Sequence, residues 1–450
     1  MKFFKLLLLV NLILTISNIS LANEVFVINN KEIPKTKILF IGFDQSDPYL
    51  RAPAFEIMER IRINLKTTDL FEIIKQEAPS QNVNASNSLP KSFTQVDINQ
   101  APDFTKYADA KIGAVVLASF NRDVSGSLEV RVRAFDIIDQ KQLFGKFYTA
   151  SKDNYRKVAN SISNEIFKTI TGETIGHFDS KIVYIAETGS IRNRIKKIAE
   201  IDFDGENHQY LTNGYDLVLT PVFAGKRDEI YFVRYFQDRP QIFSLNTQNL
   251  RSEKLGGFKI TTFSPYVNPT DSNLILLSAI QDGNSDIYEI NVAQNTARRF
   301  TKSSAIDTTP SYSPDGKMIA FASDRSGSQQ IYTVTNDGYS LKKISQGGGN
   351  YSKPVYSPDG KLITFTKMQG GKFYIGVMLA DGSSERILSS GYLVEGARFS
   401  PSGRHIIFSK KKGPYGKDST PRLIVVDVLT GFEYELPTPE NEGASDPDWK

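Results

Sequence analysis

A short motif that recurs along the second half of the chain constrains the fold more than any other feature. Tyr312-Ser-Pro-Asp-Gly, Tyr356-Ser-Pro-Asp-Gly and Phe399-Ser-Pro-Ser-Gly are three copies of one turn, and their prolines are 44 and 43 residues apart. A looser copy surrounds Pro265, and a degraded copy surrounds Phe223. Self-similarity at a period of about 20 to 50 residues is typical of repeat architectures. We therefore expect each copy to mark one structural unit.

Each copy of the motif is followed by short apolar runs that turn residues separate. After the copy at Tyr312, for example, KMIAFAS, QIYTVT and LKKIS follow in order. Together with the strand that leads into the motif, they make four strands. Four antiparallel strands in about 40–45 residues indicate one blade of a β-propeller. The starts of the second strands predict six blades: Lys181, Glu229, Asn273, Lys317, Lys361 and Arg404.

The two ends of the repeat region predict how the ring of blades closes. The region opens at KIVYIAE, which corresponds to a second strand, and the chain ends in DPDWK, which corresponds to a first strand. We expect this last strand to complete the first blade, with Trp449, the only tryptophan, packed inside it. In the repeated turn, proline fixes φ, glycine takes a positive φ and aspartate caps the turn, so these residues are structural.

Residues 36–175 combine expected strands with expected helices and therefore predict an α/β domain. This domain precedes a propeller over residues 176–450. KTKILFIGF, FEII, KIGAVVLASF, SLEVRVRAFDII and KQLFGKFYT are the expected strands. APAFEIMERIRINLKTTDLF predicts a helix with Pro53 in its first turn, and SKDNYRKVANSISNEIFKTITGE predicts an amphipathic helix. Ser151 or Asp153 is expected to cap the start of the second helix and Gly172 its end. Residues 78–92 predict a surface loop.

The beginning of the chain has the pattern of an export signal. MKFFKLLLLVNLILTISNISLA combines a basic start, an apolar stretch and a small-residue end. Ser20 and Ala22 fit the −3 and −1 positions of a cleavage site, so we expect residues 1–22 to be removed after Ala22 and the protein to be exported. The alternative is an uncleaved membrane anchor, although the apolar stretch is shorter than the ~20 residues that a span needs.

Composition argues against several kinds of chemistry. The absence of cysteine excludes disulfides, thiolate nucleophiles and cysteine-ligated zinc. The three histidines are far apart in the sequence, so a histidine-rich metal site is not expected. A net charge of +4 without a basic run does not favour nucleic acid. Residues 202–206 and 282–286 resemble incomplete calcium loops. A hydrolase of the propeller-peptidase type needs a G-x-S-x-G elbow, which is missing. We expect no catalytic residue, no metal and no cofactor.

The order of these parts resembles the TolB family. The resemblance covers nearly the whole chain after the export signal, and it is clearest in FDIIDQKQLFGKFYTASKDNYRK before the propeller and in DTTPSYSPDGKMIAFASDRSG within it. It implies a non-enzymatic periplasmic protein of the Tol–Pal system that supports outer-membrane invagination and integrity during cell division. It also implies two partners, the lipoprotein Pal and the protein TolA. The alternative is an exported propeller scaffold with another periplasmic partner, because a fold does not fix a function.

Residues 23–35, NEVFVINNKEIPK, are the segment that the resemblance assigns to TolA. Its apolar side chains fill both faces of an extended strand, so the segment can add to the edge of a partner's sheet. It can equally be the first strand of its own domain, and the two interpretations are compatible. The candidate contact residues are Glu24, Val25, Phe26, Val27, Ile28 and Ile33.

The loops that lead into the first strand of each blade form the expected Pal-binding mouth. Polar and aromatic residues around such a mouth suit a protein partner, although only a few residues usually carry the binding energy. The alternative for most of them is an ordinary solvated turn. The candidates are Lys259, Ile260, Asp307, Thr308, Asn350, Tyr351, Glu395 and Asp446.

Overall fold

The computed structural model describes residues 34–42, 48–74, 97–124, 126–190, 193–225, 228–237, 239–256, 261–414 and 420–450. The expected export signal, the residues assigned to TolA from Glu24 to Ile33, and the loop at 78–92 lie outside these ranges. Within them, no helix is both long enough and apolar enough to cross a membrane.

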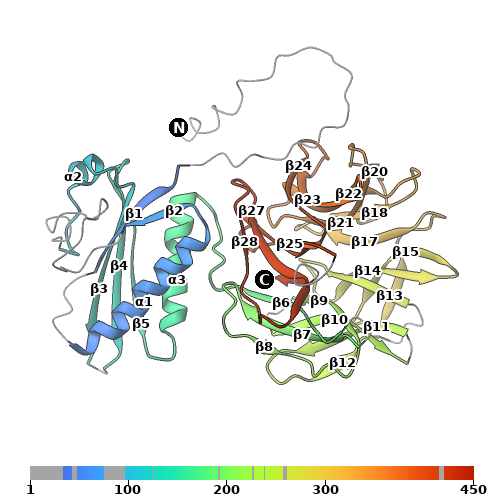
Figure 1. Cartoon of the computed structure of the whole chain (residues 1–450), viewed down its shortest axis with the longest axis horizontal. Coiled ribbons are helices and arrows are strands. Elements are labelled where there is room, and N and C mark those ends of the chain that lie inside the picture. The colour runs from blue at the N-terminus through green and yellow to red at the C-terminus, as the bar shows by residue number, and fades with distance from the viewer. Residues whose placement is uncertain are drawn as a thin grey trace, which may run out of the picture.

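The N-terminal domain is built on a mixed sheet in the order β2-β1-β3-β4-β5 (Figure 1). β1 runs parallel to β2 and β3, and the remaining neighbours are antiparallel hairpins. This arrangement confirms the α/β domain expected from the sequence. The strands are β1 (Thr36–Gly42), β2 (Phe71–Ile74), β3 (Ala114–Arg122), β4 (Leu128–Asp136) and β5 (Lys141–Ala150).

Two long helices, α1 (Pro48–Thr67) and α3 (Tyr155–Thr171), pack against each other and against the sheet. Their apolar faces are largely buried, and the buried amide of Asn64 donates to Asn160 Oδ1 at 2.8 Å across the helix pair. The short helix α2 (Phe104–Asp109) was not expected. It contributes buried Tyr107 to a second apolar cluster with strands β1, β3 and β4.

The helix boundaries correct two details of the sequence prediction. α1 begins at Pro48, so Pro53 lies in its second turn and not in its first. The residue that precedes α3 is Asn154, whose side chain accepts a hydrogen bond from the Ser151 N–H at 2.7 Å and does not cap the helix. The expected end is confirmed, because Gly172 has a left-handed φ of 78°.

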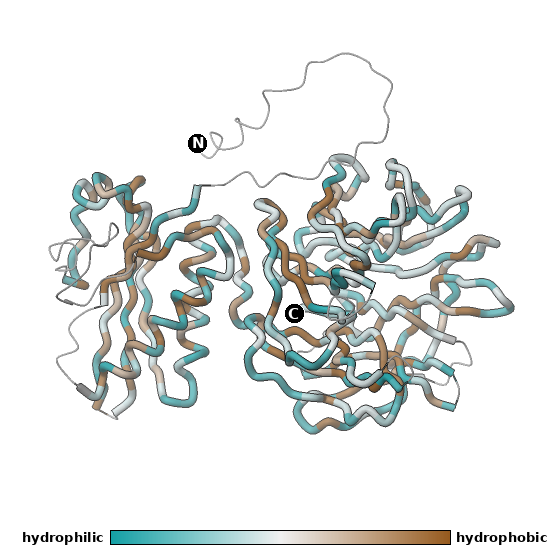
Figure 2. Tube along the Cα trace, viewed as in Figure 1, coloured by the Kyte–Doolittle hydropathy of each residue, from teal (hydrophilic) through white to brown (hydrophobic). Residues whose placement is uncertain are grey.

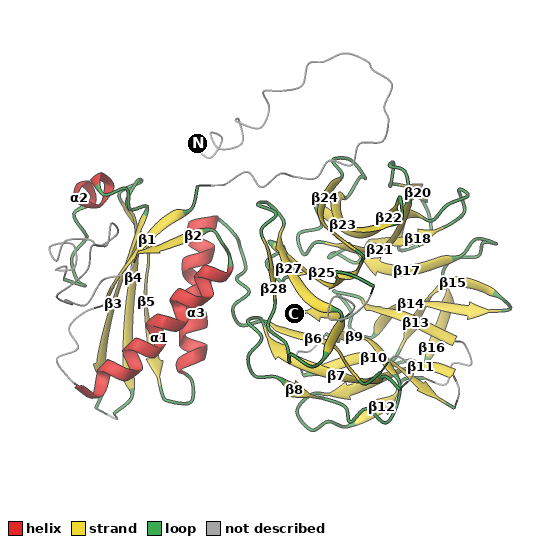
Figure 3. Cartoon of the chain, in the orientation of Figure 1, coloured by secondary structure: helices red, strands yellow, loops and turns green. Residues whose placement is uncertain are grey.

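The rest of the described chain is a ring of six four-stranded antiparallel sheets, and it has no helix after Gly172 (Figure 3). Every expected start of a second strand is confirmed to within one residue. Apolar residues follow the strands while many exposed turns are hydrophilic, so the core lies within and between the blades (Figure 2). From the inner strand outward, the blades are β29 (Gly443–Trp449), β6 (Lys181–Thr188), β7 (Ile195–Asp202), β8 (Gln209–Tyr210); β9 (Val218–Phe223), β10 (Glu229–Phe236), β11 (Arg239–Asn246), β12 (Ser252–Lys254); β13 (Thr261–Val267), β14 (Leu274–Gln281), β15 (Asn284–Asn291), β16 (Thr296–Arg299); β17 (Asp307–Tyr312), β18 (Met318–Ser323), β19 (Gln330–Thr335), β20 (Lys342–Lys343); β21 (Asn350–Tyr356), β22 (Leu362–Gln369), β23 (Lys372–Leu379), β24 (Arg386–Gly391); and β25 (Leu393–Phe399), β26 (His405–Lys411), β27 (Arg422–Asp427), β28 (Glu433–Glu435).

The ring closes as the two ends of the repeat region predict. β29 pairs with β6, and the backbones of Lys181 and Lys450 exchange two hydrogen bonds of 2.8 and 2.9 Å. Trp449 is only 7% exposed, and its indole N–H donates to Ser180 Oγ at 2.7 Å. The last strand therefore joins the beginning of the propeller to its end.

The repeated turn has the geometry expected from its residues. Asp315 Oδ1 accepts hydrogen bonds from the Ser313 hydroxyl at 2.6 Å and from the Lys317 N–H at 3.1 Å. Gly316 follows with a φ of 70°. Asp359 makes the same pair of contacts one blade later, so these aspartates are confirmed as turn-stabilising residues.

Two arginines join the α/β domain to the first blade. Arg60 of α1 and Arg156 of α3 both bind carboxylates at the end of β7 and in the turn after it, which are Asp202, Asp204 and Glu206. Burial opposes the charge of Arg156, but the three carboxylates raise its pKa. We call these five residues the arginine junction.

Candidate functional site

The propeller has two unlike faces. We call the side on which the six inner strands begin the mouth face, and the side on which they end the far face. In an antiparallel blade, the second strand begins and the third strand ends on the far face. Lys181 begins the second strand β6 and Asp202 ends the third strand β7, so the arginine junction lies at the far face. The mouth face is therefore turned away from this contact.

Every inner strand carries a bulge near the mouth, because its pairing with the second strand shifts register there. In each bulge one residue has a left-handed φ, and all six such residues line a single cavity of about 50 Å³. They are Thr220 (45°), Ser264 (51°), Thr309 (51°), Lys353 (50°), Gly396 (73°) and Asp446 (47°). We call them the mouth ring.

The mouth ring is strained, and the sequence does not predict it. Positive φ is unfavourable for residues other than glycine, above all for a β-branched residue such as Thr220. Five of the six residues precede a proline, a context that favours extended backbone. Strain of this kind costs about 1–3 kcal/mol for each residue and is concentrated at functional sites. The signal that could have revealed it is the X-Pro pair that recurs in the inner strands.

Charged side chains at and next to the mouth ring form a cluster in which two carboxylates face one ammonium group. Lys353 Nζ lies 3.1 Å from Glu395 and 3.9 Å from Asp446. The N–H of Lys353 also donates to Thr309 Oγ1 at 3.1 Å, which links neighbouring inner strands. One ammonium group thus faces two carboxylates. Glu395 and Asp446, both expected at the mouth, are brought together there.

Two other expected mouth residues are buried. Asp307 has no exposed surface, and both of its oxygens accept hydrogen bonds of 2.9 Å from Arg325. Tyr351 is equally buried, and its hydroxyl donates to Glu385 at 2.7 Å. These residues stabilise the loops through buried hydrogen bonds and have no exposed surface that a partner could contact.

The remaining expected residues divide into two groups. Thr308 and Asn350 are half-buried at the starts of β17 and β21, and Thr308 Oγ1 accepts a 3.3 Å hydrogen bond from Gln329. Lys259 and Ile260 lie outside the described residues.

Sequence reasoning missed a set of exposed apolar side chains on the mouth face. They lie at the ends of second strands or just before inner strands, usually one to a loop. Tyr215 is 90% exposed and Tyr392 is 54% exposed. Exposed apolar surface of this kind marks protein interaction sites. The set, which we call the rim, comprises Tyr215, Leu217, Phe236, Ile280, Ile306, Met368 and Tyr392.

In the two acidic turns that resemble calcium loops, arginine side chains pair with the carboxylates. Asp204 accepts hydrogen bonds from both Arg60 and Arg156, and Asp286 Oδ2 accepts one from Arg299 at 2.6 Å. Across the described ranges, no group of three or more His, Asp or Glu side chains is arranged to hold a metal ion. The mouth face offers apolar contacts and a small acidic cluster, which suit docking.

The fold and this face define a six-bladed β-propeller protein with an N-terminal α/β domain and exposed apolar side chains on the mouth face. A family model described as the TolB beta propeller domain matches residues 167–450. A Tol-Pal system protein TolB from Gluconobacter oxydans (strain 621H) is 42% identical over 392 residues, which cover 86% of this chain and 81% of the relative. The chain belongs to the TolB family.

Solved structures share the architecture. TolB from Acinetobacter baumannii superposes with a TM-score of 0.77 over 93% of this chain and 97% of its own, at 23% identity. The hydrazine synthase of Kuenenia stuttgartiensis matches 60% of this chain and 46% of its own, with a TM-score of 0.50 at 14% identity. Likeness at such low identity shows the fold alone, so function has to be argued from the mouth face and the family.

Proposed function

We propose that this protein is a non-enzymatic binding component of the Tol–Pal system that works in the periplasm. It binds the lipoprotein Pal through the mouth face and TolA through residues 23–35. In this role it supports outer-membrane invagination and integrity during cell division. Membership of the TolB family and the description of a relative as a Tol-Pal system protein support the proposal.

The observation that carries the Pal assignment is the combination of the rim with the mouth ring. The rim offers exposed aromatic and aliphatic anchors, and aromatic residues are enriched where protein interfaces gain most of their energy. The mouth ring lies inside the rim, with two carboxylates facing the single ammonium group of Lys353. A partner segment that combines apolar side chains with a basic group fits this surface.

Calorimetry with the soluble domain of Pal from the same organism tests the assignment. The protein lacking residues 1–22 is expected to bind in a saturable one-to-one complex. Absence of binding at any practical concentration would leave the fold intact and assign the mouth face to another periplasmic partner.

Matched variants test which face is used. Tyr392→Ala removes a rim anchor and is expected to weaken Pal binding by about tenfold, as loss of an interface tyrosine often does. Tyr339→Ala is the control, because Tyr339 is 73% exposed but lies in the turn that follows the third strand β19, at the far face. Equal effects of the two substitutions would rule out the mouth face.

The TolA assignment has a separate test. Deletion of residues 23–35 is expected to abolish TolA binding while the affinity for Pal is retained. A truncated protein that binds TolA normally would refute the role of this segment. Sequencing the periplasmic protein from its N-terminus is expected to begin at Asn23.

A further inference from the structure

A second cavity, of about 310 Å³, occupies the far end of the ring axis. It adjoins the mouth cavity, since Val222, Val355 and Arg398 line both of them. The side chain of Arg398 therefore stands between the two spaces. We call the larger space the far cavity.

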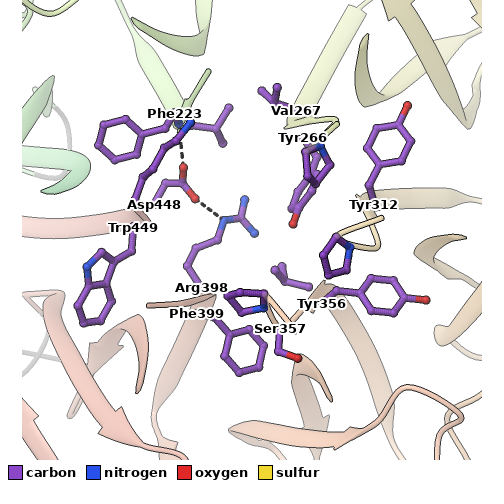
Figure 4. A pocket seen from close by; sticks show the side chains of 16 residues that line it. Phe223, Tyr266, Val267, Tyr312, Tyr356, Ser357, Arg398, Phe399, Asp448 and Trp449 are labelled. Atoms are coloured by element: carbon purple, nitrogen blue, oxygen red, sulfur yellow. Dashed lines mark hydrogen bonds and ion pairs between the residues drawn. The ribbon is translucent and has the colours of Figure 1, made fainter. Parts of the chain in front are cut away.

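Neighbouring groups hold Arg398 in a fixed orientation. Its Nε–H donates to Asp448 Oδ1 at 3.0 Å, and its guanidinium carbon lies 5.6 Å from the centre of the Tyr266 ring. The other oxygen of Asp448 accepts a hydrogen bond from the Phe223 N–H at 2.8 Å. Both oxygens of Asp448 are thus engaged, and Figure 4 shows the guanidinium group extending into the middle of the cavity.

Most of the hydrogen-bonding capacity of Arg398 is unused. A guanidinium group has five N–H donors in one plane, and only Nε–H has a partner here. Within the described parts of the chain, no hydrogen bond is formed by Nη1, by Nη2 or by the Tyr266 hydroxyl. The side chain of Arg398 is 22% exposed, so these donors are open to the cavity and can bind a ligand with oxygen acceptors.

The residues that line the far cavity indicate which chemical group accompanies the oxygen acceptors of the ligand. These residues are mainly apolar, and they include Tyr312, Tyr356, Phe399, Trp449 and Pro358. A carboxylate matches the two terminal amines of an arginine, and the apolar walls suit a compact apolar group attached to it. A metal cation is not favoured, because both oxygens of Asp448 already accept hydrogen bonds.

We propose that the far cavity binds a terminal carboxylate attached to a compact apolar group, with Arg398 as the anion-binding residue. The volume is at the lower end of the range for small-molecule sites, which is about 300–1,000 Å³. A free amino-acid derivative and the C-terminus of a peptide both present this chemistry.

The protein carries its own reporter for this site. Trp449 is the only tryptophan of the chain and is one of the residues that line the far cavity, so its fluorescence is expected to report a bound ligand. Titration of the protein lacking residues 1–22 with N-acetyl-leucine is expected to change the fluorescence in a saturable way. N-acetyl-leucinamide, which has the same body without the charge, is expected to cause no saturable change. Equal responses to both compounds would overturn the proposal.

Variants show whether Arg398 provides the anion site. Arg398→Met is expected to weaken binding of N-acetyl-leucine by about tenfold to a hundredfold, the usual effect of losing hydrogen bonds to a charged group. Arg251→Met is the control, because Arg251 is exposed and lies next to the outer strand β12. Unchanged affinity in the Arg398 variant would refute the assignment.

A second variant protects the test against misfolding. Tyr266→Phe keeps the ring under Arg398 and removes only the hydroxyl, so folding is expected to be normal and binding severalfold weaker.

An acetylated tetrapeptide that ends in leucine distinguishes the two ligand sources. Binding of this peptide as tight as that of N-acetyl-leucine indicates a chain terminus, and exclusion of the peptide indicates a free small carboxylate. If neither compound binds, the proposal is wrong.

Discussion

The far face and the mouth face of this propeller are built from the same repeat but differ in how they use it. At the far face, the arginine junction pairs its charges, and His177 and Phe178 pack among aromatic rings of both domains. At the mouth face, backbone strain is repeated around the ring and apolar side chains remain exposed. The comparison indicates that paired charges and packed rings stabilise the far face around its cavity, whereas the mouth face keeps backbone strain and exposed apolar side chains.

The largest effect is expected where the ring closes, near the far face. Trp449→Ala removes a buried ring and its hydrogen bond to Ser180, and is expected to lower the free energy of unfolding by about 3–5 kcal/mol. Denaturant titration followed by circular dichroism measures the change. Trp449→Phe keeps most of the packing and is expected to cost less. A loss below about 1 kcal/mol for the alanine variant would contradict the closure of the ring by the last strand.

Acid is expected to act mainly through the far face. His177 and His405 lie 4.8 Å apart between ring centroids, and burial lowers both pKa values, that of His405 to about 3. An unfolded histidine has a pKa of about 6.5, so below pH ~6.5 the unfolded chain binds protons that the native protein does not. Stability therefore falls as pH decreases from about 6.5 towards 3 and does not depend on these groups above that window.

A pH series of unfolding experiments measures this contribution. The two histidines are expected to make the protein about 3 kcal/mol less stable at pH 5.5 than at pH 7.5. His405→Gln removes one of the two titrating groups, so its stability is expected to change less steeply over the same range. An identical slope in the variant would mean that His405 remains able to accept a proton in the native protein.

The sequence predicted the blades well because their signals are local. Alternating apolar residues and Ser-Pro-Asp-Gly turns depend on a few neighbours, so the predicted starts of the second strands were correct to within one residue. The mouth was harder. An aspartate such as Asp307 in a polar loop is normally expected to face solvent. Only the folded structure shows that Asp307 is buried and paired with Arg325. The rim could not be predicted from the sequence, because most of its members are single apolar residues in separate loops. Only the closed ring of blades brings them to one face.

The arginine junction is expected to make a smaller contribution than the packed rings. Arg156 contacts three carboxylates but keeps part of its side chain in water, so Arg156→Ala is expected to cost about 1–2 kcal/mol. Thermal unfolding at low and high salt measures it, since screening reduces the effect of ion pairs. Lys141→Ala, which breaks an exposed pair with Asp139, is the control and is expected to have no measurable effect. Pal binding at the mouth face is expected to be unchanged in both variants.

The smallest effect, of opposite sign, is expected in the mouth ring. Thr220 has a φ of 45°, and its buried hydroxyl has no hydrogen-bond partner in the described parts of the chain. Thr220→Gly relieves the strain and removes the unpaired hydroxyl, so it is expected to stabilise the protein by about 1 kcal/mol. At Thr309, which has a similar φ of 51°, the hydroxyl accepts a hydrogen bond from Lys353. Thr309→Gly therefore loses a contact together with the strain and is expected to be nearly neutral.

Denaturant titration of the two glycine variants isolates what the strain of the mouth ring costs. A stabilised Thr220→Gly protein that binds Pal more weakly would indicate that the fixed backbone is retained for binding, because a more flexible loop loses more entropy when it docks. A stabilised variant with unchanged affinity would instead assign binding to the rim side chains alone. Destabilisation by Thr220→Gly would mean that the left-handed backbone is not strained, and the contrast between the two faces would then rest only on exposure.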